Sequence, residues 1–309
     1  MPLDPDIQIM LEQMSQMGFP HPGELSAAEM RAVFEGVSRG MPVGPEMDRV
    51  EDHSVDVGGV IPVRLYVPRT PIRAILLHLH GGGWTLGSIA SSDMASRTYA
   101  ERLRCAVISV DYRLGPEHPF PAAVDDSYAA YLWAAENSAR LIGRDLPLMV
   151  GGDSAGGNLS AVICQLARDR SGPRIAAQIL INPATDADMD APVLSAFESP
   201  FLTKEEIRWF YDQYAPDPES RLDPRLAPIR AASLAELPPA FVLTCEYDLL
   251  RAEGEAYALQ LGMAGVATVI KRYPGTTHSF LPQNPWLVRS QEAFADLNRF
   301  IAGFVENIE

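Results

Sequence analysis

The spacing of apolar residues along the chain changes near residue 54, from a helical period to short runs typical of strands. Within residues 1–45, apolar side chains recur twice at i, i+3, i+4 and i+7, which predicts two amphipathic helices. The two sets are Ile7, Met10, Leu11 and Met14, then Met30, Val33, Phe34 and Val37. Ser26 and Glu29 stand at capping-box positions before the second set, so we expect a helix to begin there.

Beyond this point, short β-rich runs alternate with helical stretches. The runs are residues 60–67, 75–80, 106–111, 148–151, 178–181, 241–245 and 268–273. Several are continuously apolar, as expected for strands buried on both faces. The alternation predicts a mostly parallel sheet with helices on both faces, and such sheets bind ligands beyond the carboxyl ends of their strands. We assign residues 46–184 and 236–309 to this α/β domain.

Residues 185–235 interrupt the alternation. They contain few β-rich runs, a capping box at Thr203 and Glu206, and the aromatic residues Trp209, Phe210, Tyr211 and Tyr214. We interpret this stretch as an insertion that folds over the top of the sheet beside residues 1–45. An ordinary peripheral helix that packs at the edge of the core is the alternative.

Two motifs carry the chemistry. Residues 80–84 read HGGGW and residues 152–156 read GDSAG, so the second matches G-x-S-x-G. In that order the pair is typical of the α/β-hydrolase nucleophile elbow and its oxyanion loop. We predict that Ser154 is the nucleophile. A serine at a helix start can also be a simple N-cap, but the flanking glycines and the glycine loop favour the nucleophile.

A serine nucleophile requires a base held by a carboxylate, in the chain order Ser, acid, His for this fold class. Of six histidines, His278 alone follows Ser154, in a loop after the last β-rich run. The acid is expected after residues 241–245, where Asp248 is the leading candidate and Glu246 the second. If Glu246 is not the acid, we expect it to bind nearby backbone or an arginine.

The oxyanion formed by such a nucleophile requires N–H donors at a fixed position. Gly82 and Gly83 offer two without side-chain obstruction, and Ala155, directly after the nucleophile, offers a third. Trp84 is predicted to line the substrate pocket, with packing in the core as the alternative.

Composition narrows the function further. The 309 residues include 40 acidic and 25 basic ones, giving a net charge of −15. This balance argues against binding to nucleic acid or to anionic lipid. Cys105, Cys164 and Cys245 are widely spaced in apolar runs, which predicts buried reduced thiols and no metal site. We find no secretion signal and no apolar run that could span a membrane, so we expect a cytoplasmic protein.

The chain resembles the bacterial hormone-sensitive-lipase-like carboxylesterases, family IV esterases of the α/β-hydrolase superfamily. The resemblance includes DYRLGPEHPFPA at residues 111–122 and EYDLLR at 246–251. It implies an eight-stranded sheet, a helical cap, and the triad Ser154, Asp248 and His278. Homodimers are common among such relatives, which leaves a dimer open. Gly115, Leu249 and Ser279 depart from the residues usual in the family.

Four charged residues around this motif have no obvious catalytic role. We expect Asp111, Arg113, Glu117 and Asp125 to form a buried ion-pair and hydrogen-bond network under the site. Ser279, beside the base, could alter the mobility of His278.

Together these features predict a cofactor-independent serine carboxylesterase acting on small esters with short or medium acyl chains. The same triad also serves lactonases, amidases and acyltransferases, which remain alternatives. A non-catalytic receptor for a small ligand is disfavoured because His278 is present.

Overall fold

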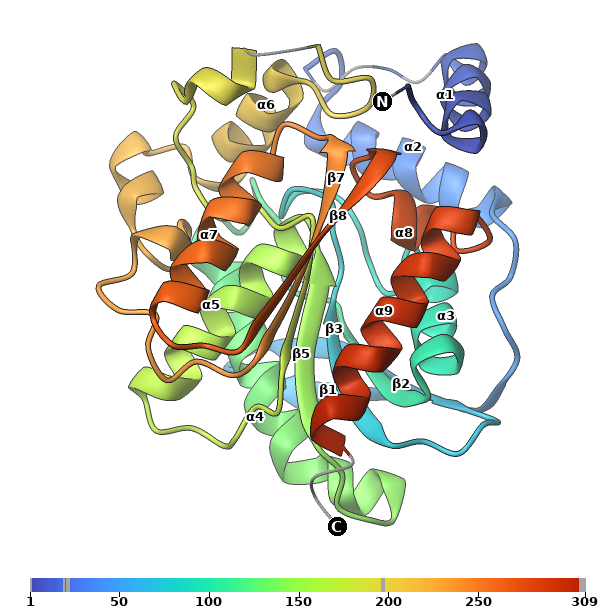
Figure 1. The fold of residues 1–309 in the computed structure, drawn as a ribbon, viewed down its shortest axis with the longest axis vertical. Helices are drawn as coiled ribbons and strands as arrows, with labels where there is room; N and C mark the ends of the chain where they lie inside the picture. Colours follow the sequence, from blue (N-terminus) through green and yellow to red (C-terminus); the bar gives the residue numbers. More distant parts are fainter. Residues whose placement is uncertain (1, 19, 21–22, 196–197, 306–309) are drawn as a thin grey trace.

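The computed structural model describes residues 2–18, 20, 23–195 and 198–305, and an eight-stranded sheet forms its centre (Figure 1). The strands are β1 (Met47–Asp56), β2 (Val60–Pro68), β3 (Ala74–Leu79), β4 (Cys105–Val110), β5 (Leu148–Asp153), β6 (Gln178–Ile181), β7 (Ala240–Tyr247) and β8 (Thr268–Thr277). The α-helices are α1 (Pro5–Met17), α2 (Ala27–Gly40), α3 (Asp93–Leu103), α4 (Ala122–Ile142), α5 (Ala155–Asp169), α6 (Lys204–Tyr214), α7 (Arg251–Met263), α8 (Phe280–Gln283) and α9 (Val288–Val305). Three 3₁₀ turns are η1 (Pro192–Ser195), η2 (Pro218–Leu222) and η3 (Pro228–Arg230).

The strand order is β1-β2-β4-β3-β5-β6-β7-β8. β2 pairs antiparallel with β1 and β4, and all pairs from β4 through β8 are parallel. The predicted mostly parallel α/β-hydrolase sheet is therefore confirmed. All seven predicted runs fall on strands, and β5, β7 and β8 extend further than predicted, to Asp153, Tyr247 and Thr277.

The sequence pattern did not predict β1. Its half-buried positions include Arg49, Glu51 and His53, whereas Val50 on the other side is exposed. An edge strand that pairs with one neighbour has little apolar surface to bury, so the alternation that marks a strand is weak there.

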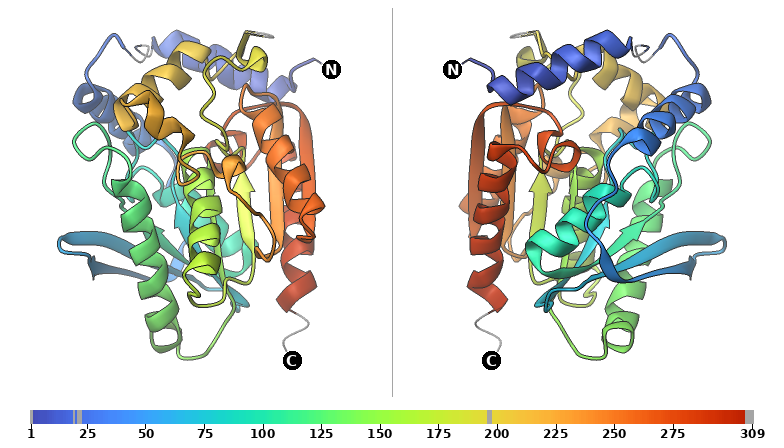
Figure 2. Two further views of the ribbon diagram at one scale, coloured as in Figure 1. Left: turned by 90° about the vertical axis from the view of Figure 1, so that its left-hand side faces the viewer. Right: turned by 90° about the vertical axis from the view of Figure 1, so that its right-hand side faces the viewer.

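Two apolar cores lie on the two faces of the sheet. Along β3, Ile75 and Leu77 join one core and Ala74 and Leu76 the other, as the two-residue period of a strand requires. Helices α4, α5 and α7 cover the first face, and α3 and α9 cover the second (Figures 1 and 2).

Helices α1, α2 and α6 lie at the end of the sheet where the parallel strands finish (Figure 2). The predicted helices near the N-terminus are confirmed, including the capping box of Ser26 and Glu29. The predicted capping box at Thr203 and Glu206 also opens α6. These helices are placed over the carboxyl ends of the strands, where a ligand site is expected.

Cys105, Cys164 and Cys245 are free and buried, as predicted. Burial raises the pKa of the Cys105 thiol to about 12. Across the described ranges, no helix combines the length and the apolar character needed to cross a lipid bilayer.

Candidate active site

Ser154 stands between β5 and α5 with φ 54° and ψ −118°. For a residue other than glycine such a backbone conformation costs about 1–3 kcal/mol and requires support from its surroundings. Its N–H donates to the Ile181 carbonyl (2.9 Å), and its carbonyl accepts from Asn158 N–H (2.9 Å). Among the described residues, no helix N–H binds its hydroxyl. The N-cap alternative is therefore wrong, and the side chain lines a cavity.

Two glycines allow the elbow to approach β3. A Cβ atom on Gly156 would lie 1.8 Å from the Leu79 carbonyl oxygen, and one on Gly152 would lie 2.1 Å from it. Backbone atoms of a central strand cannot move away to make room. Any side chain at either position would therefore displace Ser154 from its place above the sheet.

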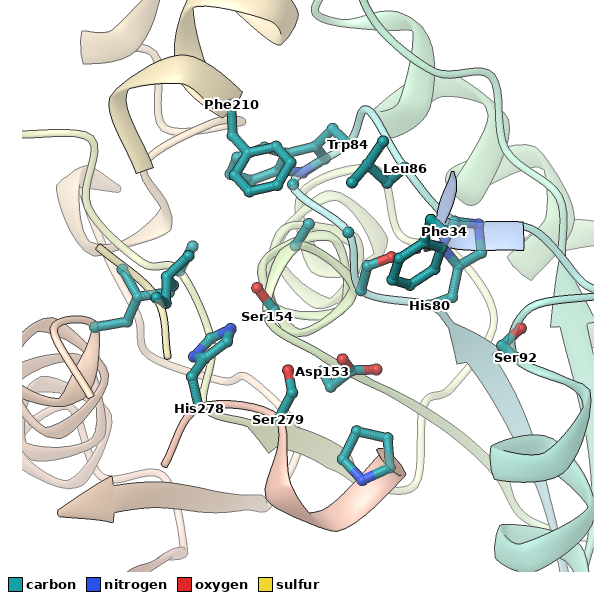
Figure 3. A pocket seen from close by; sticks show the side chains of 18 of the residues that line it. Phe34, His80, Trp84, Leu86, Ser92, Asp153, Ser154, Phe210, His278 and Ser279 are labelled. Atoms are coloured by element: carbon teal, nitrogen blue, oxygen red, sulfur yellow. Dashed lines mark hydrogen bonds between the residues drawn. The ribbon is translucent and has the colours of Figure 1, made fainter. Parts of the chain in front are cut away.

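His278 directly follows β8, and Asp248 directly follows β7, its parallel neighbour. His278 Nδ1 lies 2.8 Å from Asp248 Oδ2, and both side chains are buried. The other carboxylate oxygen of Asp248 accepts from Leu250 N–H (2.9 Å). This arrangement holds the proton on Nδ1 and leaves Nε2 as the basic nitrogen. In Figure 3 the His278 ring lies beside the Ser154 side chain.

Asn182 also contacts the histidine, and the sequence analysis missed it. Its amide nitrogen lies 3.4 Å from Nδ1 and 3.5 Å from Nε2 of His278. Nearly equal distances to both ring nitrogens place the amide against the face of the ring. The sequence could have indicated Asn182 through its position directly after β6, because it then lies at the carboxyl ends of the parallel strands, as Asp248 and His278 do.

Glu246, the second candidate for the acid, is bound elsewhere. Its Oε2 accepts from the Gly275 N–H (2.8 Å), and this bond holds the pKa of Glu246 below its usual range. The side chain thus binds nearby backbone, which is the structural role expected for it if Asp248 is the acid.

The peptide groups of the glycine loop are fixed by bonds to their carbonyls. His80 Nδ1–H donates to the Gly81 carbonyl (2.8 Å), and the N–H groups of Thr85 (3.1 Å) and Leu86 (2.8 Å) donate to the Gly82 carbonyl. In a trans peptide the N–H points opposite to the carbonyl of the preceding residue. The N–H groups of Gly82 and Gly83 therefore point away from these bonds.

Within the described part of the chain, no acceptor binds the N–H of Gly82, Gly83 or Ala155. Gly82 and Gly83 have φ of 115° and 58°, which side-chain-bearing residues rarely adopt. These three donors have the freedom that an oxyanion hole requires.

A cavity of about 200 Å³ opens beside Ser154 (Figure 3). Its wall is largely apolar and includes Phe34 from α2 and Phe210 from α6. Phe34 was predicted only as part of a helix face, because nothing in that pattern distinguishes a cavity wall from a core. Trp84 lines the cavity and is also buried against α6, where it stacks on Tyr214 with ring centroids 5.0 Å apart. Trp84 is therefore packed in the core and also lines the cavity, while its contact with substrate stays a prediction.

Ionisable groups near the cavity are shifted by burial. Burial lowers the pKa of His78 to about 3 and lowers that of His80, so both rings are neutral. The same cause raises the pKa of Asp153, beside Ser154, to about 6. In the described residues no cluster of three or more His, Cys, Asp or Glu side chains could hold a metal ion.

The predicted buried network of Asp111, Arg113, Glu117 and Asp125 is wrong. Glu117 and Asp125 are exposed. The Arg113 guanidinium instead pairs with Asp126 (2.7 Å), which is fully buried and also accepts from the Arg113 N–H. Asp125 lies one residue earlier on α4, a rotation of about 100° that turns it towards solvent.

Comparison with known proteins agrees with this geometry. A family model described as the alpha/beta hydrolase fold matches residues 76–282. The chain is 43% identical to the carboxylic ester hydrolase LipN of Mycobacterium tuberculosis over 298 residues, covering 90% of this chain and 77% of that protein. It is 35% identical to an arylesterase of Saccharolobus solfataricus, covering 91% and 93% respectively.

Among solved structures, a hyperthermophilic esterase from Pyrobaculum calidifontis superposes with a TM-score of 0.90 at 39% identity, covering 99% of both chains. The family model, the sequence identities and the fold all point to the same group of proteins. The chain therefore belongs to the hormone-sensitive-lipase-like esterase family of the α/β hydrolases.

Proposed function

We propose that this protein is a serine carboxylesterase that hydrolyses esters with short or medium acyl chains through Ser154, His278 and Asp248. The observation that carries the proposal is the 2.8 Å bond between Asp248 and His278. It orients a ring that lies beside a serine held in a strained turn on the cavity wall. The names of the relatives, carboxylic ester hydrolase and arylesterase, support the same chemistry.

In the acylation step, Ser154 Oγ attacks the ester carbonyl carbon while His278 Nε2 takes its proton. Asp248 stabilises the resulting imidazolium through Nδ1–H. The negative charge on the former carbonyl oxygen is bound by the N–H groups of Gly82, Gly83 and Ala155. His278 then protonates the leaving alcohol, and the acyl group remains on Ser154.

In the deacylation step, water attacks the acyl-enzyme with His278 again as base, and Ser154 is regenerated as the acid departs. Both steps need a neutral His278, so the rate should fall on acidification. No cofactor enters either step.

We further propose that residues 1–45 and 185–235 form a helical cap over the α/β domain of residues 46–184 and 236–309. Phe34 on α2 and Phe210 on α6 contribute to the cavity wall, which supports this division. A largely apolar cavity of about 200 Å³ favours a small ester over a long lipid chain. Three free buried thiols fit a reducing compartment such as the cytoplasm.

The test is hydrolysis of a p-nitrophenyl ester series, from acetate to decanoate, by wild type and by Ser154→Ala. We expect turnover with short chains that is lost in Ser154→Ala and kept in Ser233→Ala, a matched change at an exposed serine. Equal weak activity in wild type and Ser154→Ala would overturn the proposed nucleophile. Faster hydrolysis of long-chain emulsions would overturn the proposed substrate class.

A further inference from the structure

Arg31 on helix α2 binds the loop that follows the glycines. Its Nε donates to the Thr85 carbonyl (2.7 Å) and Nη2 donates to the Gly115 carbonyl. Glu117 accepts from Nη1 (2.9 Å) and from Nη2 (2.6 Å). A planar guanidinium with all three nitrogens bound is fixed in both position and orientation. Arg31 therefore links α2 to two separate loops, the one after β3 that contains Thr85 and the one after β4 that contains Gly115.

Thr85 is the residue that closes the glycine turn. Its N–H donates to the Gly82 carbonyl (3.1 Å), and its Oγ1 donates to the Gly83 carbonyl (3.0 Å). Its side chain is fully buried. Because a peptide group is planar, a displacement of Thr85 also turns the N–H of Gly83, which shares a peptide with the Gly82 carbonyl.

Arg31 also reaches the loop after the glycines indirectly, through Gly115. The Gly115 N–H donates to the Trp84 carbonyl (2.9 Å), while the Gly115 carbonyl is bound by Arg31. Arg31 thus restrains the segment that follows the glycines at Thr85 directly and at Trp84 through Gly115. Arg31 does not line the cavity, so a direct contact with substrate does not explain its position.

We propose that Arg31 is a positioning residue for the oxyanion hole, which fixes the Gly82 and Gly83 N–H groups through Thr85 and Gly115. Helix α2 then contributes to the rate of the chemical step as well as to the cavity wall. This inference rests on the proposed function, because it assigns Arg31 an effect on the oxyanion of that reaction.

The test compares Arg31→Met and Arg31→Lys with wild type and with Arg39→Met, a control on the same helix whose side chain is 80% exposed. Arg31→Met keeps the length of the apolar stem and removes every N–H donor. Since small misplacements of catalytic groups can lower rates about 100-fold, we expect kcat to fall about 10- to 100-fold with little change in KM. Arg31→Lys should recover part of the loss, and Arg39→Met should behave as wild type.

A reversible inhibitor separates this effect from general destabilisation. Ser154 Oγ adds to the carbonyl carbon of an alkyl trifluoromethyl ketone, its proton passes to His278, and the new oxyanion occupies the same N–H donors. Affinity for this inhibitor should therefore fall by the same factor as kcat/KM in Arg31→Met. Affinity for the alcohol product, which forms no oxyanion, should not change.

The results separate the inference from the function on which it rests. An active wild type with Arg31→Met of unchanged kcat, or with only a raised KM, would overturn the role of Arg31 alone. A wild type without Ser154-dependent turnover would overturn the proposed function itself. If Arg31→Met does not fold, Arg31→Lys is measured in its place, because one ammonium nitrogen cannot bind Thr85, Gly115 and Glu117 together as the guanidinium does. A partial fall in kcat, matched by the fall in inhibitor affinity, is then expected, and its absence would contradict the proposal.

Discussion

Replacement of Asp248 by Asn tests which carboxylate holds His278, the proposed catalytic base. Asp248 is fully buried, with one oxygen on His278 Nδ1 (2.8 Å) and the other on the Leu250 N–H (2.9 Å). An asparagine has the same shape but carries one acceptor and one donor. While the ring proton stays on His278 Nδ1, the asparagine can therefore accept from only one of the two N–H groups, that of His278 or that of Leu250.

The Leu250 N–H decides the orientation of the new amide. If the amide oxygen stays on this N–H, the NH₂ group faces His278 Nδ1 and drives the ring proton to Nε2, where it blocks proton transfer from Ser154. The reversed amide restores the ring tautomer but places two donors against each other, at a cost of about 1–3 kcal/mol. It also lacks the negative charge that stabilises the imidazolium.

These two effects together predict a fall in kcat/KM of about 10³- to 10⁴-fold, or roughly 4–5.5 kcal/mol of transition-state stabilisation. The assay is steady-state hydrolysis of p-nitrophenyl butyrate at neutral pH. The matched control is Glu246→Gln, which keeps an acceptor for the Gly275 N–H and is expected to retain nearly full activity. If Glu246→Gln shows the larger loss and Asp248→Asn stays active, the acid is Glu246 and the reasoning fails.

Three further changes test the surroundings of the site. Asp153→Asn removes a carboxyl whose folded pKa, about 6, exceeds its ordinary value of 3.8, so the contribution of Asp153 to wild-type stability is largest below pH 3.8 and is lost as pH rises through 6. Urea unfolding should show the stability of the variant relative to wild type rising by about 2 kcal/mol from pH 4 to pH 7; no rise would refute the shift. Asp126→Ala should lower the free energy of unfolding by about 1–3 kcal/mol because the Arg113 N–H loses its acceptor, while the half-exposed Arg113 guanidinium stays solvated; the exposed Asp125→Ala should have almost no effect. Phe210→Ala opens the cavity wall beside Gly83 and should move the preferred acyl chain by about two carbons towards longer esters in the p-nitrophenyl series; an unchanged optimum would exclude Phe210 from the acyl site.

The strands that position Ser154, Asp248 and His278 could be predicted because they are central and buried on both faces. Continuous apolar runs mark them, and each functional residue follows directly where its strand ends. The edge strand β1 has no such signal. Its inner side carries Arg49 and Glu51, and in the sheet it pairs with β2.

The sequence pattern could not predict the contacts between segments that lie far apart in the chain. Arg31 binds Thr85 and Gly115, which lie 54 and 84 positions further along the chain, and no local period encodes that docking. The ion-pair partner of Arg113, in contrast, could have been predicted from the sequence. Asp126 falls in the buried stripe of α4, with Ala123 and Ala130, whereas Asp125 lies outside it. The phase of the helix, rather than proximity in the motif, identifies the buried acid.

The glycine loop that we propose as the oxyanion hole is restrained from both of its sides, so a run of flexible glycines can serve there as a fixed set of N–H donors. On the sheet side, His80 binds the Gly81 carbonyl, and the stacked Tyr112 hydroxyl donates to the His80 carbonyl (2.7 Å). On the other side, Thr85 binds the carbonyls of Gly82 and Gly83. Donors held in this way need no reorganisation when negative charge develops, which is the condition for strong electrostatic stabilisation.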